Sequence, residues 1–362
     1  MAARGTAALT TSSPTWADES PEARLDVIAA MGAAACGARP VVRSRLVAGL
    51  PVRFEFATEQ LADVLTRAFA HLPECEHEAP AFTVVAWDSA GTGAPPPPLP
   101  PDPDPGGPMW RRVLVDEPPL HAVSKPGPGE LSVVERRKAR AWYWCADAAA
   151  VPMWEQGTPF LHVLHHWLSS VGMQLVHAGA AGDEDGGVVF VGKSGSGKST
   201  STLACVDAGM RYAGDDYVVV ATRPTPTVHA LYSSGKLDGD QVTRFPELAS
   251  WVVNPEATAD EKRVFFVADH APERVAVSFP LRAVVLPRIA GRLGSGLRPA
   301  TAAAALAALA PSTIFQMPGA AGVELADIAD LVRAVPAHVL DAGSDLRGLA
   351  AVVRTLSRGE RV

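Results

Sequence analysis

The chain has 362 residues, of which 48% are hydrophobic and 20% are charged, and its formal net charge is −7 at pH 7. This balance is typical of a globular protein of two or three domains, and the acidic excess argues against nucleic acid as the main partner. The four cysteines lie far apart without a C-x-x-C pair. They predict reduced thiols in a cytoplasmic protein and argue against a disulfide framework or a zinc site.

The sequence offers no candidate for a signal peptide or a membrane span. Residues 1–20, which we expect to be disordered, mix threonine, serine and acidic residues and have no continuous apolar core. The longest uncharged stretch, Pro299 to Val323, is broken by Pro311, Pro318 and two glycines. Its helical part, Ala302 to Ala310, is far shorter than the ~20 residues that a membrane-spanning helix needs. We therefore expect a soluble chain without a membrane partner.

Residues 21–150 are predicted to form a small N-terminal α/β domain of unknown role. Ser20 is expected to cap a helix that has Pro21 in its first position and ends at Gly37. The other predicted elements are a strand over Val47 to Phe56 with a turn or an edge at Leu50-Pro51, a helix capped by Thr58, and strands over Phe82 to Trp87, Val113 to Val115 and Arg140 to Cys145.

Prolines dominate the stretch from Gly91 to Pro108, which is therefore expected to form neither a helix nor a strand. Its composition predicts an exposed loop with polyproline II character. Two uses of such a loop are open, a spacer within the domain and a proline-rich docking ligand, and the spacer is favoured.

Residues 151–362 are predicted to form the second domain. Thr158-Pro159 begins a helix with an apolar stripe, and His162, His165 and His166 lie on the same helix. No carboxylate or cysteine joins these histidines at a useful spacing. Packed or solvated histidines are therefore favoured over a metal site.

An apolar strand carrying His177 is predicted over Met173 to Ala181. The turn from Asp183 to Gly187 leads into the next strand, so the two strands are expected to pair as a hairpin. The remaining predicted elements are strands over Val218 to Ala221, Val228 to Tyr232, Ala283 to Leu286 and His338 to Asp341, and helices over Leu325 to Ala334 and Leu346 to Leu356.

Residues 192–199 match the phosphate-binding pattern G-x-x-x-x-G-K-S, between a short apolar strand and a helix that ends at Gly209. Backbone N–H groups of such a loop curl around a phosphate, and glycines leave the space that this needs. The helix start directs its positive dipole end at the same anion. A glycine-rich loop that only turns a corner is the disfavoured alternative. The residues predicted to bind ATP are Gly192, Lys193, Ser194, Gly195, Ser196, Gly197, Lys198, Ser199 and Thr200.

Two charged or polar side chains of this loop have specific predicted roles. The Lys198 ammonium is expected to reach the β- and γ-phosphates, and the Ser199 hydroxyl is expected to be a ligand of Mg²⁺. Asp215 and Asp216 follow Lys198 by seventeen and eighteen residues, with room between them for one helix and one reversal. We therefore expect both carboxylates on the strand next to the loop, at the edge where the γ-phosphate and Mg²⁺ would lie.

Adjacent side chains on an extended segment point in opposite directions, so Asp215 and Asp216 are expected to have different roles. One carboxylate can bind Mg²⁺, directly or through water, and the other can accept the proton of an attacking hydroxyl. A Gly-Asp-Asp turn without catalytic function is the alternative.

Three segments together resemble the catalytic domain of bacterial HPr kinase/phosphorylase, whose phosphate-loop fold is related to that of phosphoenolpyruvate carboxykinase. They are His177-Ala178-Gly179, Gly192 to Thr200 and Gly214-Asp215-Asp216. The resemblance implies a mixed sheet flanked by helices over residues 151–362. It also implies the roles of single residues: Lys198 holds phosphate, Ser199 binds Mg²⁺, Asp216 is the general base, Asp215 assists at the metal or phosphate, and His177 lies by the reacting phosphate. One sequence does not fix which aspartate is the base.

The chain departs from that family after the predicted hairpin. HPr kinases carry a Glu-x-Arg-Gly-x-Gly signature there, which supplies a metal ligand and a substrate clamp, and Leu231 to Leu237 lacks it. Neither HPr as the substrate nor the phosphorylase reaction therefore follows from the resemblance. Lys236 either offers a positive charge to the phosphates or lies on the surface.

The predicted function is a Mg²⁺- and ATP-dependent kinase that phosphorylates a serine hydroxyl of a peptide or a small protein. Relatives of the domain act as serine kinases on peptide natural products or on free amino acids. One alternative is therefore a small-molecule kinase, with free serine as an example, and another is a nucleotide-dependent switch or scaffold. A peptide kinase should have an open groove beside Asp216, and a small-molecule kinase a closed pocket. A homo-oligomer is compatible with the sequence.

Overall fold

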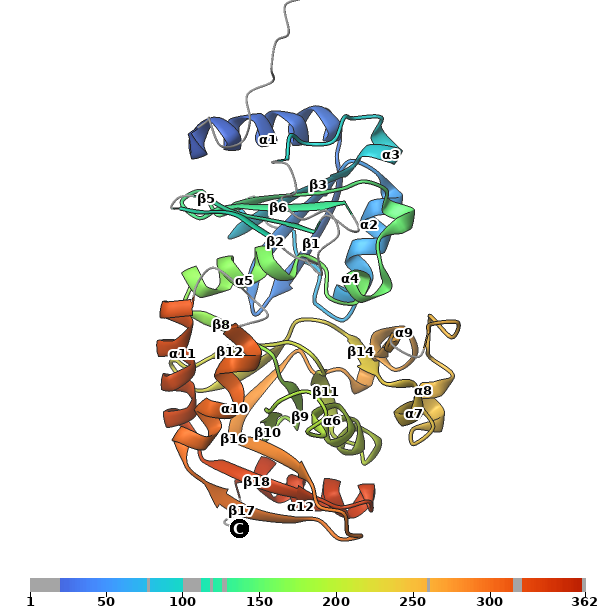
Figure 1. The fold of residues 1–362 in the computed structure, drawn as a ribbon, viewed down its shortest axis with the longest axis vertical. Helices are drawn as coiled ribbons and strands as arrows, with labels where there is room; N and C mark the ends of the chain where they lie inside the picture. Colours follow the sequence, from blue (N-terminus) through green and yellow to red (C-terminus); the bar gives the residue numbers. More distant parts are fainter. Residues whose placement is uncertain are drawn as a thin grey trace, which may run out of the picture.

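The computed structural model describes residues 20–76, 79–99, 112–117, 120–125, 129–258, 261–314 and 321–359, the side chains of 321–324 excepted. These residues form two large β-sheets, each flanked by helices, and one small two-stranded sheet (Figure 1). The predicted α/β class is confirmed. Residues 1–19 of the predicted disordered segment, and residues 100–108 of the proline-rich stretch, lie outside the described residues.

The first sheet has seven strands in the order β1-β2-β3-β7-β6-β5-β4. Strand β3 is parallel to both β2 and β7, and the other neighbouring pairs are antiparallel. The strands are β1 (Val41–Val47), β2 (Leu50–Phe56), β3 (Phe82–Asp88), β4 (Arg112–Glu117), β5 (Leu120–Lys125), β6 (Glu130–Glu135) and β7 (Arg140–Cys145).

Helices cover both faces of this first sheet. Helix α1 (Pro21–Cys36) lies on the outer face, where Leu25 and Ile28 pack against Trp87, Trp142 and Trp144 (Figure 1). The other face carries most of the remaining helices of this half: α2 (Glu59–Thr66), η1 (Arg67–Phe69), η2 (Ala148–Ala150), α4 (Met153–Gly157) and α5 (Leu161–Ser170).

Two of these helices begin at the capping residues predicted from the sequence. The Ser20 hydroxyl accepts a hydrogen bond from the Ala23 N–H at the start of α1, which ends at Gly37 with φ of 60°. The Thr58 hydroxyl caps α2 through the Leu61 N–H. Such caps satisfy N–H groups that the first helical turn leaves unpaired.

Other predictions for this half were wrong in detail. Residues 47–56 are not one strand, because the chain reverses at Ala48 and Gly49, which have φ of 49° and 82°, and so forms the β1–β2 hairpin. Gly91 lies inside the one-turn helix α3 (Ser89–Thr92), whose N–H groups are capped by Asp88. The buried strands β5 and β6 were not predicted, since charged and polar residues interrupt their apolar pattern.

The second sheet has nine strands, and its main path runs β11-β9-β10-β16-β13-β12-β8, with β18 joining β16 to β17. Strand β16 is parallel to β10 and β18, and the other pairs are antiparallel. The strands are β8 (Met173–Val176), β9 (Gly179–Asp183), β10 (Gly186–Phe190), β11 (Arg211–Gly214), β12 (Val218–Ala221), β13 (Thr227–Ala230), β16 (Ser278–Ile289), β17 (Gly296–Ala300) and β18 (Ala337–Ala342).

Helices α6 (Lys198–Asp207) and α12 (Leu346–Ser357) cover one face of this sheet, and α10 (Ala302–Ile314) and α11 (Ala321–Ala334) cover the other (Figure 1). Successive side chains of a strand point to opposite faces of the sheet, so β10 contributes to the apolar core on each face. Val188 and Phe190 pack with α6 and α12, whereas Val189 and Val191 belong to the core beneath α10 and α11.

The predicted strand over Met173 to Ala181 is in fact two strands at separate positions. Strand β8 pairs with β12 at one end of the sheet, and β9 lies between β10 and β11. The break falls at His177 and Ala178, just before Gly179. Helix α6 comes so close to Gly179 that a Cβ there would collide with the Thr202 hydroxyl. The predicted β9–β10 hairpin is confirmed.

A smaller unit lies beside α6. Strands β14 (Ser234–Leu237) and β15 (Arg263–Phe266) pair with each other and hold a group of short helices. These helices are α7 (Gly239–Val242), α8 (Pro246–Ala249), α9 (Val267–His270) and η3 (Pro272–Arg274).

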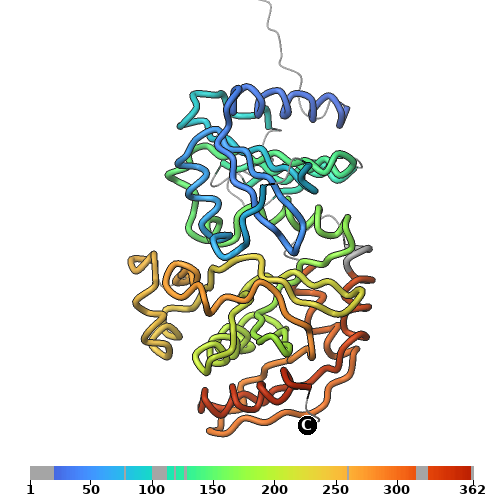
Figure 2. The backbone as a smooth tube through the Cα atoms, turned by 180° about the vertical axis from the view of Figure 1, so that it is seen from behind, coloured from blue at the N-terminus to red at the C-terminus, as the bar shows by residue number. Residues whose placement is uncertain are grey.

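One apolar core joins the two large sheets. It runs from the inner face of the first sheet through Phe160 to residues of the second half, and the ring of Phe69 lies 5.4 Å from that of Tyr232. Figure 2 shows from behind that the segment containing α4 and α5 crosses between the two halves. The division into domains at residue 150 stays a prediction.

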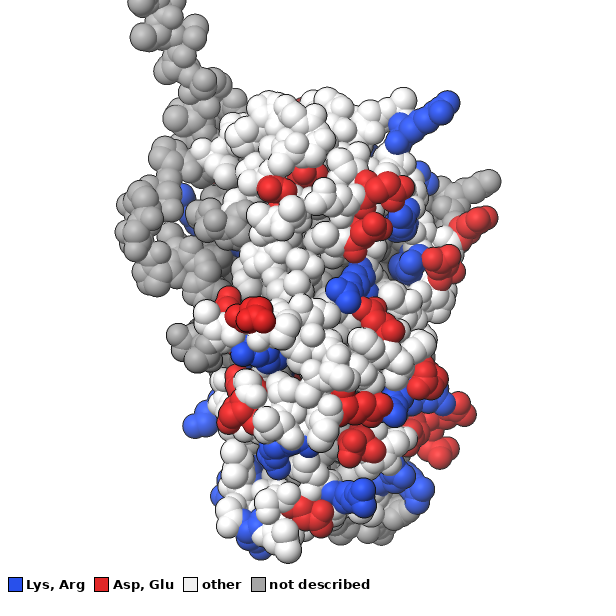
Figure 3. All heavy atoms as spheres, turned by 90° about the vertical axis from the view of Figure 1, so that its right-hand side faces the viewer, with Lys and Arg blue, Asp and Glu red and all other residues white. Residues whose placement is uncertain are grey.

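Two surface properties bear on the predicted partners. Basic and acidic side chains are interspersed on the face seen in Figure 3. Within the described ranges, no helix combines the length and the apolar character needed to cross a membrane.

Candidate functional site

The phosphate-loop pattern forms a tight turn between β10 and α6. Gly192, Gly195 and Gly197 have φ of 146°, 75° and 99°, a region that residues with a Cβ rarely adopt. A Cβ at Gly192 would also lie only 2.8 Å from Ser196 Oγ. Helix α6 begins at Lys198, directly after the loop, so its first N–H groups face the hollow of the turn.

The Lys198 ammonium lies over this turn. It donates hydrogen bonds to the carbonyl oxygens of Gly192, at 2.7 Å, and Lys193, at 3.3 Å. Burial lowers the pKa of Lys198, and the nearby carboxylates of Asp216 and Asp215 act in the opposite direction. The side chain thus crosses the mouth of the loop, where a bound anion would meet it.

Asp215 and Asp216 lie in the turn between β11 and β12, not on the strand beside the loop. Strand β9 stands between β10 and β11, since the β9–β10 hairpin occupies the position next to the loop strand. Their predicted opposite orientation is present. Asp215 is buried and accepts a hydrogen bond from the Lys236 N–H at 3.1 Å, whereas Asp216 lines a cavity in front of the loop.

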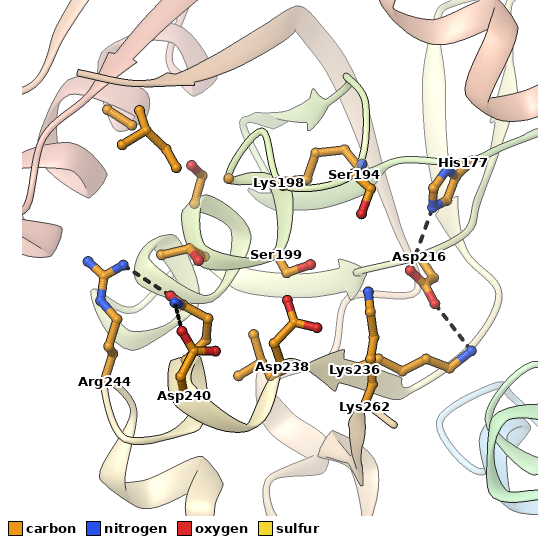
Figure 4. A pocket seen from close by; sticks show the side chains of 18 of the residues that line it. His177, Ser194, Lys198, Ser199, Asp216, Lys236, Asp238, Asp240, Arg244 and Lys262 are labelled. Carbon is orange, nitrogen blue, oxygen red and sulfur yellow. Dashed lines mark hydrogen bonds and ion pairs between the residues drawn. The ribbon is translucent and has the colours of Figure 1, made fainter. Parts of the chain in front are cut away.

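Asp216 is held from two sides (Figure 4). Its Oδ1 is 3.6 Å from His177 Nε2, and its Oδ2 is 3.2 Å from Lys236 Nζ. Burial alone would raise the pKa of Asp216, but the Lys236 ammonium and the neighbouring His177 imidazole outweigh it and hold the pKa well below its usual range. Asp216 is therefore an ionised carboxylate that faces the cavity.

His177 lies at the break between strands β8 and β9. Its backbone N–H donates to Thr313 Oγ1 of helix α10 at 3.1 Å, and its ring packs 5.3 Å from that of Tyr217. These contacts fix the imidazole beside Asp216.

Asp215 and Ser199 together offer oxygen donors for a divalent cation. Burial and the neighbouring Asp216 raise the pKa of Asp215 to about 6, although the Lys236 N–H and the Ser199 hydroxyl lower it. Within the described residues, Asp215 Oδ1 is buried without a hydrogen-bond partner. Mg²⁺ favours oxygen ligands and is usually bound by one or two protein groups together with phosphate oxygens and water. The pair therefore fits Mg²⁺, even though no group of three or more His, Cys, Asp or Glu among the described residues could hold a metal.

Two lysines of the β14–β15 unit complete the site. Lys236 is not a surface residue, since it lines the cavity and its side chain is 11% exposed. Lys262, which precedes β15, directs its ammonium into the space between Ser199 and Asp216 (Figure 4). Sequence reasoning missed Lys262, because only the pairing of β14 with β15 brings it to the loop.

The cavity in front of the loop has a volume of about 1120 Å³. Loop residues and the start of α6 line it, together with Asp216, His177 and Lys236. Pockets for one drug-sized ligand measure roughly 300–1,000 Å³, so this cavity lies just above that range.

The histidines of α5 are packed side chains, one of the two outcomes expected. All three are buried, and the ring of His166 lies 3.6 Å from that of His121 on β5. His162 alone of the three lines the cavity.

Comparisons with known proteins find similar solved structures but no similar sequence. No protein-family model and no curated protein matches the sequence. The solved structure of the Hpr(Ser) kinase/phosphatase from Coxiella burnetii is similar over 51% of this chain and 89% of that chain, with 15% sequence identity and a TM-score of 0.29. At this level the likeness carries no argument about residues or substrates. The predicted family stays a prediction.

Proposed function

We propose that the protein is a Mg²⁺- and ATP-dependent phosphotransferase that moves the γ-phosphoryl group of ATP to a hydroxyl. The observation that carries the proposal is the position of Asp216. This ionised carboxylate lines the same cavity as the phosphate loop and is braced by His177 and Lys236. Deprotonation of an acceptor hydroxyl requires an ionised carboxylate of this kind.

The loop and its lysines supply the positive field for a triphosphate. The N–H groups at the start of α6 and the Lys198 ammonium would hold the phosphate oxygens, and Lys236 and Lys262 add charge from the opposite wall. In phosphoryl transfer, positioning and electrostatic stabilisation provide most of the rate enhancement.

Asp216 would orient the acceptor hydroxyl and take its proton. The hydroxyl oxygen forms a bond to the γ-phosphorus while the bond to the β–γ bridging oxygen breaks, and ADP leaves. His177 keeps the Asp216 carboxylate in place. Ser199 and Asp215 would hold Mg²⁺, which neutralises charge on the phosphates when bound. The assignment of Asp216 rather than Asp215 as base is supported by its access to the cavity.

The acceptor predicted from the sequence, a serine hydroxyl of a peptide or small protein, stays a prediction. So do the cytoplasmic location and a homo-oligomeric state.

Purified protein tests the proposal through Mg²⁺-dependent ATP binding and phosphate transfer to hydroxyl acceptors. Lys198→Ala should abolish nucleotide binding, and Asp216→Asn should retain binding and lower the transfer rate by ~10²–10⁴-fold. Asp330→Asn on α11, whose side chain is 53% exposed, is the matched control and should change neither. Transfer by Asp216→Asn at the wild-type rate would refute the base assignment. Binding without transfer to any acceptor would support the switch.

A further inference from the structure

The cavity extends past Asp216 to an end built by other parts of the chain. Strand β5 contributes Lys125, helix α4 contributes Trp154 and Glu155, and the start of α5 contributes Leu161 and His162. None of these residues belongs to the phosphate loop or to the Asp-Asp turn. We call this part of the cavity the inner end.

The inner end is lined mostly by buried residues, whereas the opposite end is lined by exposed ones. Glu155 and Lys125 are only 3% and 5% exposed, although both line the cavity. At the opposite end, beyond the phosphate loop, Ile289 and Leu293 are 70% and 72% exposed. Trp154, at 42%, forms the rim of the inner end. Buried lining residues favour a small molecule over a protein segment at this end.

Contacts connect the inner end to the proposed base. Lys236 Nζ, which pairs with Asp216, is also 3.5 Å from Thr158 Oγ1. Gly157, at the end of α4, lies against the Lys236 side chain, since a Cβ there would be 3.4 Å from Lys236 Cε. Lys236 therefore lies between Asp216 and the segment that leads from α4 to α5 at the inner end.

The inner end presents both signs of charge. Lys125 Nζ is 2.9 Å from Glu130 Oε2 and also contacts Glu155 Oε2. Burial opposes the charge on Lys125, but the two glutamates prevail and raise its pKa, so it is an ammonium. An ammonium has three donors, and within the described residues these two carboxylates are its only hydrogen-bond or ion-pair partners. The Lys125 ammonium also lies 5.0 Å from the centroid of the Trp154 ring, and its side chain lines the cavity, where a ligand carboxylate can approach it.

We propose that the inner end binds a free hydroxy amino acid as the phosphate acceptor, with its carboxylate on Lys125 and its ammonium on Glu155. A zwitterion offers each member of this pair the opposite charge and adds no net charge to a buried site. Its hydroxyl then faces Asp216. This inference rests on the proposed function and departs from the peptide acceptor expected from the sequence.

Analogues of the amino acid that lack one of its two charged groups test the assignment. L-Serine, L-threonine and L-homoserine are compared with ethanolamine, which lacks the carboxylate, with glycerate, which lacks the ammonium, and with a blocked serine tripeptide. Binding is measured by titration calorimetry with Mg²⁺ and a non-hydrolysable ATP analogue, and transfer by phosphate incorporation. At least one free amino acid should bind, and both deleted analogues and the tripeptide should bind at least tenfold more weakly.

Variants connect each charge to its residue. Lys125→Met should raise KM for the amino acid at least tenfold and leave KM for ethanolamine within twofold. Glu155→Gln should also raise KM for the amino acid, but it should leave KM for glycerate unchanged. Lys125→Arg keeps the charge and should restore part of the affinity if Lys125→Met does not fold. Unchanged Mg²⁺–ATP binding serves as the test of folding for each variant.

The outcomes separate this inference from the proposed function. Failure of Mg²⁺–ATP to bind refutes the phosphotransferase. ATP binding with transfer to the tripeptide, or with no affinity for any free amino acid, overturns the inner-end assignment and leaves the phosphotransferase standing. Equal effects of Lys125→Met on serine and ethanolamine would also overturn it.

Discussion

Replacing Lys236 by methionine removes the cation nearest to Asp216, and we expect the free energy of unfolding to fall by about 3 kcal/mol. At the 3.2 Å that separates Lys236 Nζ from Asp216 Oδ2, two unit charges attract by about 5 kcal/mol at an effective dielectric constant of about 20. The two side chains are 11% and 21% exposed, so water screens little of this attraction. Part of it is offset because methionine requires no desolvation of a charge.

A double-mutant cycle in urea isolates the pair. Lys236→Met, Asp216→Asn and the double variant are unfolded in parallel, and we expect a coupling energy of ~2–3 kcal/mol, with the double variant more stable than the sum of the single effects implies. Lys262→Met is the matched control, since Lys262 lines the same cavity but is exposed, and it should cost less than ~0.5 kcal/mol. Additive single effects would show that the Lys236–Asp216 contact does not form, and the proposed bracing of the base would fail with it.

Three further predictions concern the scaffold, and each is measured by urea unfolding. Gly187→Ala should lower the free energy of unfolding by at least ~2 kcal/mol, because its Cβ would lie 2.6 Å from a backbone oxygen. Gly294→Ala is the control and should be neutral, because its Cβ would have no atom within 4 Å. Equal effects of the two substitutions would contradict the close packing of β9 and β10. Burial and a neighbouring carboxylate raise the pKa of Glu130 from 4.5 to about 7, so its ionisation destabilises the fold as the pH rises through that interval. The free energy of unfolding of Glu130→Gln, relative to that of the wild type, should therefore increase by as much as ~3 kcal/mol between about pH 4.5 and 8. A difference between the two proteins that does not change with pH would refute this. Asp345→Ala should cost ~1 kcal/mol, because its carboxylate caps α12 through two backbone N–H groups, and an unchanged midpoint would show that the cap contributes nothing.

The proposed acceptor site would give the N-terminal sheet a function that its own sequence does not predict. Lys125 lies at the end of β5, a strand with no apolar periodicity to predict it. Its partner Glu155 comes from α4, 30 residues further along the chain. If the inner-end assignment holds, the first sheet has a direct part in acceptor binding. It closes the acceptor end of the cavity.

Features that depend on neighbouring residues were predictable from the sequence. The caps at Ser20 and Thr58 and the hairpin before the phosphate loop follow from interactions within a few residues. The short interval between Lys198 and Asp216 also limited where the two could lie, because one helix and one strand fill it.

Features that depend on distant segments were not predictable in this way. The sequence by itself determined a glycine-rich turn between a strand and a helix, with an acidic pair close behind it, since local chain geometry dictates both. Only the tertiary structure decided that β9 separates the two strands, that Lys236 and Lys262 face the loop, and that Lys125 and Glu155 close the cavity. These residues meet through sheet order and burial, which reflect the packing of the whole chain and leave no periodic trace in any one segment.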